Sequence, residues 1–204
     1  MHIAIAGNIG SGKTTLTNLL AKHFNWEPHF EEVDDNPYLD DFYNQMERWS
    51  FNLQIFFLKS RYQQILEIRK QEKNVIQDRT IYEDAFIFAP NLHAMGLMTN
   101  RDFKNYIELF EVMESLINPP DLLIYLRSSI PNLVKQIQHR GRDYENSISI
   151  DYLSRLNERY EAWAQGYQKG KLVIVDVDHL DFVNKPEDLG EVINKITAEI
   201  NGLF

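Results

Sequence analysis

Short apolar runs alternate with longer amphipathic stretches along the chain. The apolar runs predict β-strands over residues 2–7, about 28–32, 74–78, 122–126 and 171–176. Apolar side chains at helical spacing predict helices over residues 48–71, 82–95, 101–117, 130–138, 151–168 and 187–201. This alternation predicts an α/β fold in which a mainly parallel sheet is flanked by helices. No repeat or linker divides the sequence, so we expect a single domain over residues 1–204.

Polar residues lie at the ends of the predicted strands. Ligands of open parallel sheets bind outside the carboxyl ends of the strands. The residues that this rule brings to one crevice are Gly7, Glu31 or Glu32, Asp78, Arg127 and Asp176.

The composition narrows the class of protein. The 204 residues, 44% hydrophobic and 25% charged, suit a soluble globular domain. The sequence shows neither an apolar run of about 18 residues, as a transmembrane helix needs, nor a signal-peptide pattern. The lack of cysteine excludes disulfides and fits a reducing compartment, so we expect a cytoplasmic protein with no membrane partner. A net charge of −9 disfavours nucleic acid as a partner, whereas a small anionic ligand needs only local positive charge.

The first predicted strand runs into a glycine-rich turn, and a helical pattern follows. Residues 7–14 match the phosphate-loop pattern G-x-x-x-x-G-K-[ST]. Its glycines let successive backbone N–H groups surround an anion, and the helix N-terminus adds its positive dipole end. Lys13 can reach the β- and γ-phosphates of ATP, and the Thr14 hydroxyl can ligate Mg²⁺. The expected ATP-binding residues are Gly7, Asn8, Ile9, Gly10, Ser11, Gly12, Lys13, Thr14 and Thr15.

Acidic residues follow the second and third predicted strands. Phosphoryl transfer to an alcohol needs a carboxylate that orients the hydroxyl and accepts its proton. Glu31 and Glu32 are the candidates after the second strand, and only one can face the site if both lie in a strand. Taken alone, the segment fits an acidic, solvated loop after an edge strand equally well. After the third strand, Asp78 is the expected partner of magnesium. Arg79 beside it is a candidate for holding a phosphate or the reacting hydroxyl.

The longest predicted helix, residues 48–71, carries Gln54 and Arg61 on an otherwise apolar face. They lie two turns apart, about 10 Å along the helix. An amide that donates and accepts hydrogen bonds suits a nucleobase edge, and Arg61 could serve there if Asp84 holds it. Phe88, one turn after Asp84, could stack on the base. The pattern by itself also fits a core helix with two polar residues at its edge.

A basic segment at about residues 138–146 contrasts with the acidic chain. His139, Arg140 and Arg142 surround Gly141, which adds flexibility. This composition fits a lid that closes its arginines over a transferring phosphate and excludes water. The alternative is a basic surface turn at a helix end, which the helix dipole would favour.

Taken in order, these segments resemble the deoxynucleoside kinase family, and most closely its bacterial deoxyadenosine/deoxyguanosine kinase branch. The matching motifs are GNIGSGKTT, EEVDDNPYL, ERWSFNLQIFFLKSR, DRTIYEDAFIF and RGRDYE. The resemblance implies a P-loop kinase fold with a five-stranded parallel sheet, flanking helices and an arginine-bearing lid. It implies transfer of the ATP γ-phosphate to the 5′-hydroxyl of a deoxyribonucleoside in nucleoside salvage, with Mg²⁺ as cofactor. It also implies a homodimer through helices 48–71 and 101–117.

The resemblance also assigns roles to individual residues. Glu31 corresponds to the general base for the 5′-hydroxyl, Arg79 to the arginine that steadies it, and Asp78 to the acid associated with magnesium. Tyr43 and Glu145 fall where the family holds the 3′-hydroxyl. The base-reading trio is Gln54, Arg61 and Asp84, the stacking aromatic is Phe88, and the lid arginines are Arg140 and Arg142.

Three positions depart from the family pattern. Glu32 stands where many relatives have proline, and Thr80 replaces a serine. Gln136 stands where relatives often have a further lid arginine, for which Lys135 or His139 could compensate. The segment DDNPYL resembles the bacterial purine branch of the family, which implies deoxyadenosine as acceptor, with deoxyguanosine next and deoxycytidine as the alternative.

Other classes of protein share the phosphate loop. A nucleoside monophosphate kinase would need further cations for its acceptor phosphate, which Glu145 would instead repel. A GTPase-type switch would carry a D-x-x-G tetrapeptide, which the sequence lacks. A binding module that uses the loop only structurally would bind nucleotide without transferring phosphate.

Overall fold

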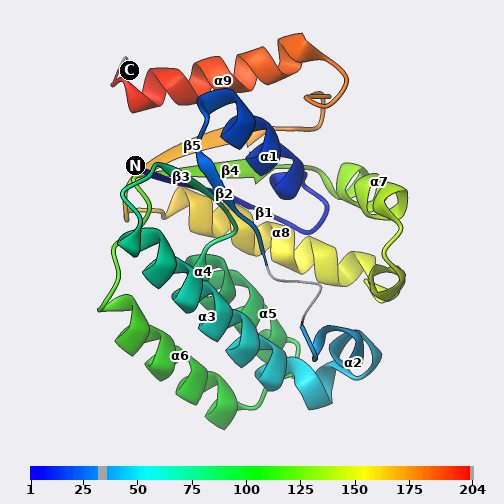
Figure 1. The fold of residues 1–204 in the computed structure, drawn as a ribbon. Helices are drawn as coiled ribbons and strands as arrows, with labels where there is room; N and C mark the ends of the chain where they lie inside the picture. The colour runs from blue at the N-terminus through cyan, green and yellow to red at the C-terminus, as the bar shows by residue number, and fades with distance from the viewer. Residues whose placement is uncertain (32–35, 203–204) are drawn as a thin grey trace.

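A parallel β-sheet forms the centre of the molecule in the computed structural model, which describes residues 1–31 and 36–202. The strands lie in the order β2-β3-β1-β4-β5, and all neighbouring pairs run parallel. Helices cover both faces of the sheet (Figure 1), which confirms the expected α/β class. The strands are β1 His2–Gly7, β2 Glu27–His29, β3 Val75–Asp78, β4 Leu122–Arg127 and β5 Lys171–Asp176.

The C-terminal end predicted for the second strand, about residues 28–32, was wrong. The bounds predicted for the other four strands agree with the structure to within one residue. β2 ends at His29, and Glu31 follows the strand instead of lying in it. Pro28 lacks a backbone donor and is tolerated because β2 is the edge strand. Strand alternation therefore does not choose between Glu31 and Glu32, and Glu32 lies outside the described residues.

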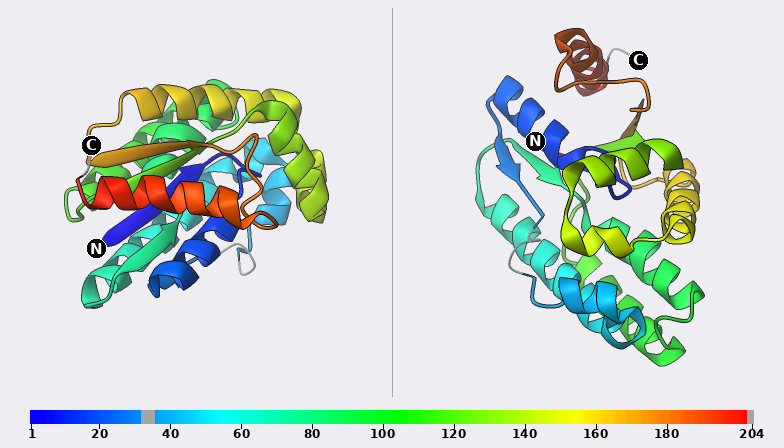
Figure 2. Two further views of the ribbon diagram at one scale, coloured as in Figure 1. Left: turned by 90° about the horizontal axis from the view of Figure 1, so that it is seen from above. Right: turned by 90° about the vertical axis from the view of Figure 1, so that its right-hand side faces the viewer.

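Helices α1 and α9 cover one face of the sheet, and α8 covers the other together with the layer that contains α3 and α6 (Figures 1 and 2). The helices predicted from the sequence are present in the predicted order, and their observed bounds differ from the predicted ones by a few residues at most. The segment 82–95 differs in its helical geometry. The longer helices are α1 Lys13–Phe24, α3 Met46–Lys70, α6 Asn100–Glu114, α7 Ile130–Arg140, α8 Ile150–Gln165 and α9 Pro186–Ile200. Within residues 1–31 and 36–202, none of the helices combines the length and hydropathy of a membrane span.

Large and small side chains alternate along β1, and each kind packs against the helices on one face of the sheet. Ile3 and Ile5 join the core beneath α1 and α9, whereas Ala4 and Ala6 face α8, where Trp163 packs against them. This is the period of two that a strand buried on both faces requires. β1 is thereby fixed at the centre of the sheet, and so is the glycine turn that follows it.

The helix predicted over residues 82–95 is present as one unbroken helical segment, but a π-helical turn interrupts its α-helical geometry. The short helix α4 (Ile81–Glu83) passes into a π-helical turn, η1 (Asp84–Phe88), before α5 (Ala89–Ala94). Pro90 lacks the N–H that a continuous α-helix would use and so favours the wider turn. Two short elements were not predicted at all, namely α2 (Leu39–Asn44) and the 3₁₀ turn η2 (Asp143–Ser147).

A chain of side-chain hydrogen bonds links the sheet to the segment that carries Glu31. His2 Nε2 lies 2.8 Å from Gln77 Oε1, and burial lowers the pKa of His2 to about 4, so the neutral ring donates. Gln77 Nε2 donates to Gln64 Oε1 at 2.7 Å. Gln64 Nε2 then donates to the carbonyl oxygen of Phe30 at 2.8 Å. The residue before Glu31 is therefore anchored to β1, β3 and α3.

Candidate functional site

The glycine turn after β1 leads directly into α1. Gly12 precedes α1 with φ +90°, a left-handed conformation that glycine adopts without strain. The Nζ of Lys13 donates to the carbonyl oxygen of Asn8 at 3.1 Å. Burial lowers the pKa of Lys13 to about 8, and the charge of Arg79 adds to this effect. Lys13 is therefore a buried cation at the positive end of α1, where it suits an anionic ligand.

Thr14 and Asp78 meet beside this lysine. The Thr14 hydroxyl donates to Asp78 Oδ2 at 2.5 Å. The other carboxylate oxygen, Asp78 Oδ1, is buried and has no hydrogen-bond partner among the described residues. A hydroxyl and a carboxylate with an uncommitted oxygen are hard donors of the kind that Mg²⁺ prefers, so these residues fit a magnesium ion.

Glu31 lies between two arginines. Its Oε1 is 2.5 Å from an Nη2 of Arg61 and 3.3 Å from Nε of Arg79. Burial alone would raise the pKa of Glu31, but the charges of Arg79, Arg61 and Lys13 outweigh burial and hold this pKa well below its usual range. Glu31 is therefore a carboxylate at neutral pH.

Arg61 pairs with a second carboxylate besides Glu31. Arg61 Nε is ion-paired with Asp84, and the whole arginine is only 3% exposed. Burial raises the pKa of the Asp84 carboxyl, and the charge of Arg61 offsets only part of this effect. Gln54, two turns earlier on α3, is buried, and its Oε1 has no partner among the described residues. This uncommitted acceptor is available to a ligand.

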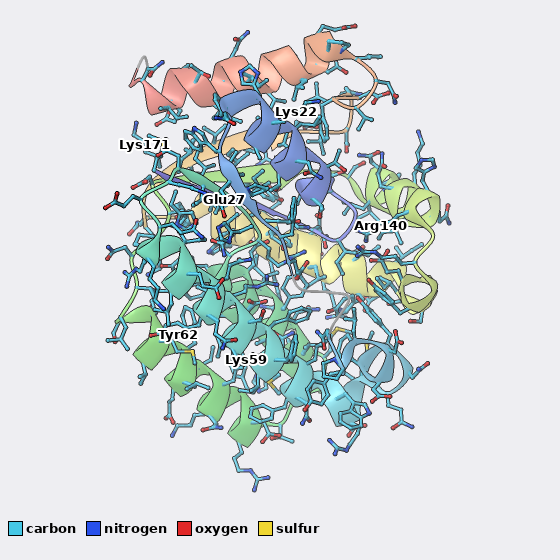
Figure 3. The ribbon with its side chains drawn as sticks, viewed as in Figure 1. Lys22, Glu27, Lys59, Tyr62, Arg140 and Lys171 are labelled. Carbon is cyan, nitrogen blue, oxygen red and sulfur yellow. The ribbon has the colours of Figure 1, made fainter. Side chains whose placement is uncertain are left out.

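The segment after α7 folds over the same space. Arg140, at the C-terminal end of α7 (Figure 3), pairs with Glu145, with Nε donating to Oε2 at 3.0 Å. Arg142 Nη1 lies 3.8 Å from Glu145 Oε1. The ring of Tyr144 stacks on that of Tyr43 in α2, with centroids 5.6 Å apart. One carboxylate therefore contacts both arginines, and an aromatic pair connects the segment to α2.

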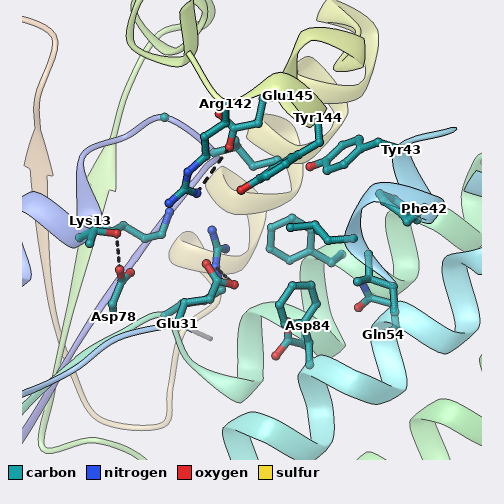
Figure 4. Close-up of a pocket in the computed structure, with 18 of the residues that line it drawn as sticks. Lys13, Glu31, Phe42, Tyr43, Gln54, Asp78, Asp84, Arg142, Tyr144 and Glu145 are labelled. Atoms are coloured by element: carbon teal, nitrogen blue, oxygen red, sulfur yellow. Dashed lines mark hydrogen bonds and ion pairs between the residues drawn. The ribbon is translucent and has the colours of Figure 1, made fainter. Parts of the chain in front are cut away.

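These groups line one cavity of about 350 Å³ (Figure 4). Lys13 and Asp78 lie at one end, Gln54 and Phe42 at the other, and Glu31 between them. The volume suits a small molecule. Aromatic and aliphatic side chains complete the wall, namely Phe30, Leu39, Phe42, Leu53, Phe57, Phe88 and Tyr152.

The structure brings together most of the residues that the sequence singled out, although Gly7, Asn8, Ser11, Gly12 and Thr15 of the phosphate loop do not line the cavity. Of the phosphate loop, the residues that line the cavity are Ile9, Gly10, Lys13 and Thr14. The expected substrate, metal and lid residues that line it are Glu31, Tyr43, Gln54, Arg61, Asp78, Arg79, Asp84, Phe88, Arg140, Arg142 and Glu145. Asn8 turns away from the cavity, and its Nδ2 donates to the carbonyl oxygen of Leu153 at 3.1 Å.

Besides Gly7, two strand-end residues do not line the cavity, and for these two the expected place in the crevice was wrong because their side chains have other partners. Arg127 turns to α8 and pairs with Glu161 at 2.7 Å. Asp176 accepts a hydrogen bond from the backbone N–H of Asp178 at 3.1 Å within its own loop. Arg127 ends β4 and Asp176 ends β5, and both strands lie on the other side of β1 from β3.

Sequence reasoning missed several residues around the site. Tyr144 lines the cavity, and Glu83 and Tyr160 contact Arg79 from behind it. The Thr80-x-x-Glu83 spacing is the signature of a capping box, which the structure contains, and could have pointed to Glu83. Nothing in the sequence around Tyr160 signals its contact with a residue 81 positions away.

A parallel sheet, a phosphate loop and an arginine-bearing segment around one cavity define a P-loop kinase. The family model of deoxynucleoside kinases matches residues 3–201. A deoxyadenosine/deoxycytidine kinase of Bacillus subtilis (strain 168) is 39% identical over 202 residues, covering 98% of this chain and 93% of the relative. A deoxyadenosine kinase of Dictyostelium discoideum is 41% identical over 192 residues, covering 94% and 77%.

A solved structure has the same fold. Deoxyadenosine kinase from M. mycoides, with products dCMP and a flexible dCDP bound, superposes with a TM-score of 0.87 at 30% identity, covering 97% of this chain and 100% of that one. The chain belongs to the deoxynucleoside kinase family. It is an ATP-dependent nucleoside kinase, as its motifs implied.

Substitution of Gly10 tests the packing of the phosphate loop against α7. Gly10 has φ +85°, and an added Cβ would lie 2.9 Å from the carbonyl oxygen of Leu133 and from Ile137 Cγ1. We therefore expect Gly10→Ala to weaken ATP binding at least about tenfold, because a clash with the backbone of α7 must displace the loop or this helix. Titration calorimetry with ATP measures the affinity.

Gly96→Ala is the matched control. Gly96 also has a positive φ, +74°, but an added Cβ meets nothing within 4 Å, so only backbone strain of about 1–2 kcal/mol is expected. Equal ATP affinities for the two variants would contradict the tight packing at Gly10.

Proposed function

We propose that this single-domain kinase phosphorylates the 5′-hydroxyl of deoxyadenosine in nucleoside salvage, with deoxyguanosine as the next acceptor. The observation that carries the proposal is the position of Glu31, between phosphate-loop residues at one end of the cavity and Gln54 at the other. A nucleoside with its base near Gln54 would direct its 5′-oxygen toward Glu31. Deoxycytidine is the alternative acceptor, as the Bacillus subtilis relative is named for both nucleosides.

Gln54, Arg61 and Asp84 recognise the base in this proposal. A glutamine amide offers a donor and an acceptor side by side, which matches adjacent positions on adenine and also on cytosine. Asp84 holds Arg61 through its Nε and thereby fixes which guanidinium edge can reach the ligand. Phe88 supplies an aromatic face in the same wall of the cavity, suited to stacking on a base.

The sugar is held at its 3′-hydroxyl by Tyr43 and Glu145. Burial raises the pKa of Tyr43 well above its usual range, so this phenol is a neutral donor and acceptor at neutral pH. Glu145 can accept a hydrogen bond from the 3′-hydroxyl once Arg140 and Arg142 leave it to bind phosphate. The stack between Tyr43 and Tyr144 joins this part of the site to the lid, residues 138–146.

Glu31 acts as the general base, and Arg79 steadies the hydroxyl that Glu31 orients. Two arginines make Glu31 a weak proton acceptor but keep it ionised. That balance suits a phosphoryl transfer with a loose transition state, in which positioning of the hydroxyl matters more than early removal of its proton. The proton passes to Glu31 as the bond to phosphorus forms.

Cations stabilise the transferring phosphate. Lys13 holds the donor phosphates, and Arg140 and Arg142 move from Glu145 to the γ-phosphate when the lid closes. Thr14 and Asp78 would hold Mg²⁺, which supplies further neutralisation of phosphate charge when bound. Closure of the lid excludes water and so limits hydrolysis of ATP.

The enzyme works in the cytoplasm as a homodimer in this proposal. Leu109 and Val112 lie on α6 and Leu116 lies just after its end, at helical spacing, and they are 36%, 62% and 59% exposed. Phe86, 41% exposed, packs edge-on against Phe110 beside these residues. Apolar side chains at helical spacing, next to α3, suit a helical contact with a second copy.

Glu31→Gln tests the general base. We expect kcat to fall about 10²- to 10⁴-fold, because the amide cannot accept the hydroxyl proton. The dissociation constant for deoxyadenosine should stay within a few-fold, since Gln54, Arg61 and Asp84 remain. A coupled ADP-release assay and calorimetry measure the two quantities. Glu27→Gln, which removes only an exposed ion pair with Lys73, is the control. Near-normal turnover in Glu31→Gln would exclude Glu31 as the base.

Asp84→Ala tests base recognition. Without its carboxylate partner, Arg61 is free to change rotamer, so the ratio of kcat/KM for deoxyadenosine to that for deoxycytidine should shift about tenfold or more. KM for ATP should change less than about twofold, because Asp84 lies at the far end of the cavity from Lys13. Initial rates with each nucleoside give both values, and an unchanged acceptor ranking would contradict this role.

A further inference from the structure

Glu83 is a fully buried carboxylate behind the wall of the cavity, 0% exposed. Its Oε1 accepts from the backbone N–H of Gly7 at 3.3 Å and from the hydroxyl of Tyr160 at 2.8 Å. Its Oε2 accepts from the backbone N–H of Thr80 at 2.7 Å. Arg79 completes the set, with Nη1 donating to Oε1 at 3.1 Å. A buried carboxylate needs a countercharge and hydrogen bonds to both oxygens, and Glu83 has both.

The two ends of the Arg79 guanidinium have different surroundings. Nη1 donates to Glu83 and also to the hydroxyl oxygen of Tyr160 at 2.7 Å. Nε lies 3.3 Å from Glu31 Oε1 but has no hydrogen-bond acceptor of suitable geometry among the described residues. The Nη1 end of the guanidinium is therefore fixed. The Nε end faces the Glu31 carboxylate, and its N–H remains available to donate a hydrogen bond.

Tyr160 is itself held rigidly. Its ring stacks on Tyr125 of β4, with centroids 5.7 Å apart and planes inclined by 4°. Its hydroxyl accepts from Arg79 and donates to Glu83, so both of its hydrogen-bonding functions are used. A phenol fixed in this way limits rotation of the guanidinium more strongly than a flexible partner would.

The backbone at Arg79 depends on the same carboxylate. Arg79 has φ +71°, a left-handed conformation that L side chains rarely adopt. The next residue, Thr80, begins α4 through a capping box with Glu83. Glu83 therefore holds the side chain of Arg79 at one oxygen and the chain that follows it at the other.

We propose that Glu83 and Tyr160 are positioning residues that direct the Nε end of Arg79 at Glu31 and the acceptor hydroxyl. This inference rests on the role proposed above for Arg79. Since Glu83 Oε1 also accepts from Gly7, the carboxylate ties the start of the phosphate loop to the arginine on the acceptor side. If these hydrogen bonds are lost, both substrates still bind, but the reacting groups are less well aligned.

A double-mutant cycle on kcat tests the proposal with Tyr160→Phe and Arg79→Lys. Tyr160→Phe keeps the ring and removes only the hydroxyl, so we expect kcat for deoxyadenosine to fall about 5- to 20-fold while KM changes less than about threefold. In the Arg79→Lys background the same substitution should change kcat less than about twofold, because no guanidinium remains to be positioned. The melting temperature of each variant reports folding separately.

Tyr125→Phe is the matched control. It removes a hydroxyl from the ring that stacks on Tyr160, but this hydroxyl donates to Glu161 at 2.8 Å and does not serve Arg79. We expect its kcat to equal that of the natural protein. A fall in kcat for Tyr125→Phe as large as for Tyr160→Phe would overturn the proposal, since the effect would then come from packing.

Two outcomes distinguish failure of the positioning role of Tyr160 and Glu83 from failure of the role proposed for Arg79. If Arg79→Lys lowers kcat, but Tyr160→Phe has the same effect in both backgrounds, the positioning role is overturned and the role of Arg79 stands. If Arg79→Lys retains the natural kcat, the role of Arg79 fails, and the inference that rests on it fails as well. A Tyr160→Phe effect confined to KM would also overturn positioning.

Discussion

The contact of the Glu31 carboxylate with two arginines is the interaction on which the site depends. Each partner serves a different part of the cavity, because Arg61 is bound to Asp84 and Arg79 to Glu83. A half-buried carboxylate between two cations stays ionised, and its charge compensates the two buried guanidinium groups for the hydration that they lose. Removal of one member therefore leaves the others uncompensated, so the cluster behaves as a unit.

The fold brings these charges together by placing the carboxyl ends of β1, β2 and β3 side by side. β1 ends in the phosphate loop, the chain after β2 carries Glu31, and β3 ends in Asp78 and Arg79. The long helix α3 then supplies Gln54 and Arg61 from one buried face. A parallel sheet thus positions the donor side of the reaction, and the helical layer positions the acceptor side.

The sequence alone predicts much of this arrangement, since local signals specify it. The phosphate loop, four of the five strands and the long helix follow from glycine spacing and hydrophobic period. Three features were not predicted. The end of β2 depends on its edge position, and the contact of Tyr160 with Arg79 joins distant segments, so neither has a local signal. The π-helical turn at Asp84 lies within a segment whose apolar spacing fits an ordinary α-helix, so hydrophobic period alone does not reveal it. The resemblance of motifs, not their periodicity, selected Tyr43 and Glu145.

In the proposed reaction the acceptor is a hydroxyl of an uncharged nucleoside, which Glu31 aligns. The most direct measurement offers the purified enzyme, with ATP and Mg²⁺, either deoxyadenosine or its 5′-monophosphate and locates the new phosphate by phosphorus NMR. We expect a monoester on the 5′-oxygen of deoxyadenosine and little reaction with the monophosphate, which Glu31 and Glu145 repel. Formation of a diphosphate from the monophosphate at equal or greater kcat/KM would contradict it.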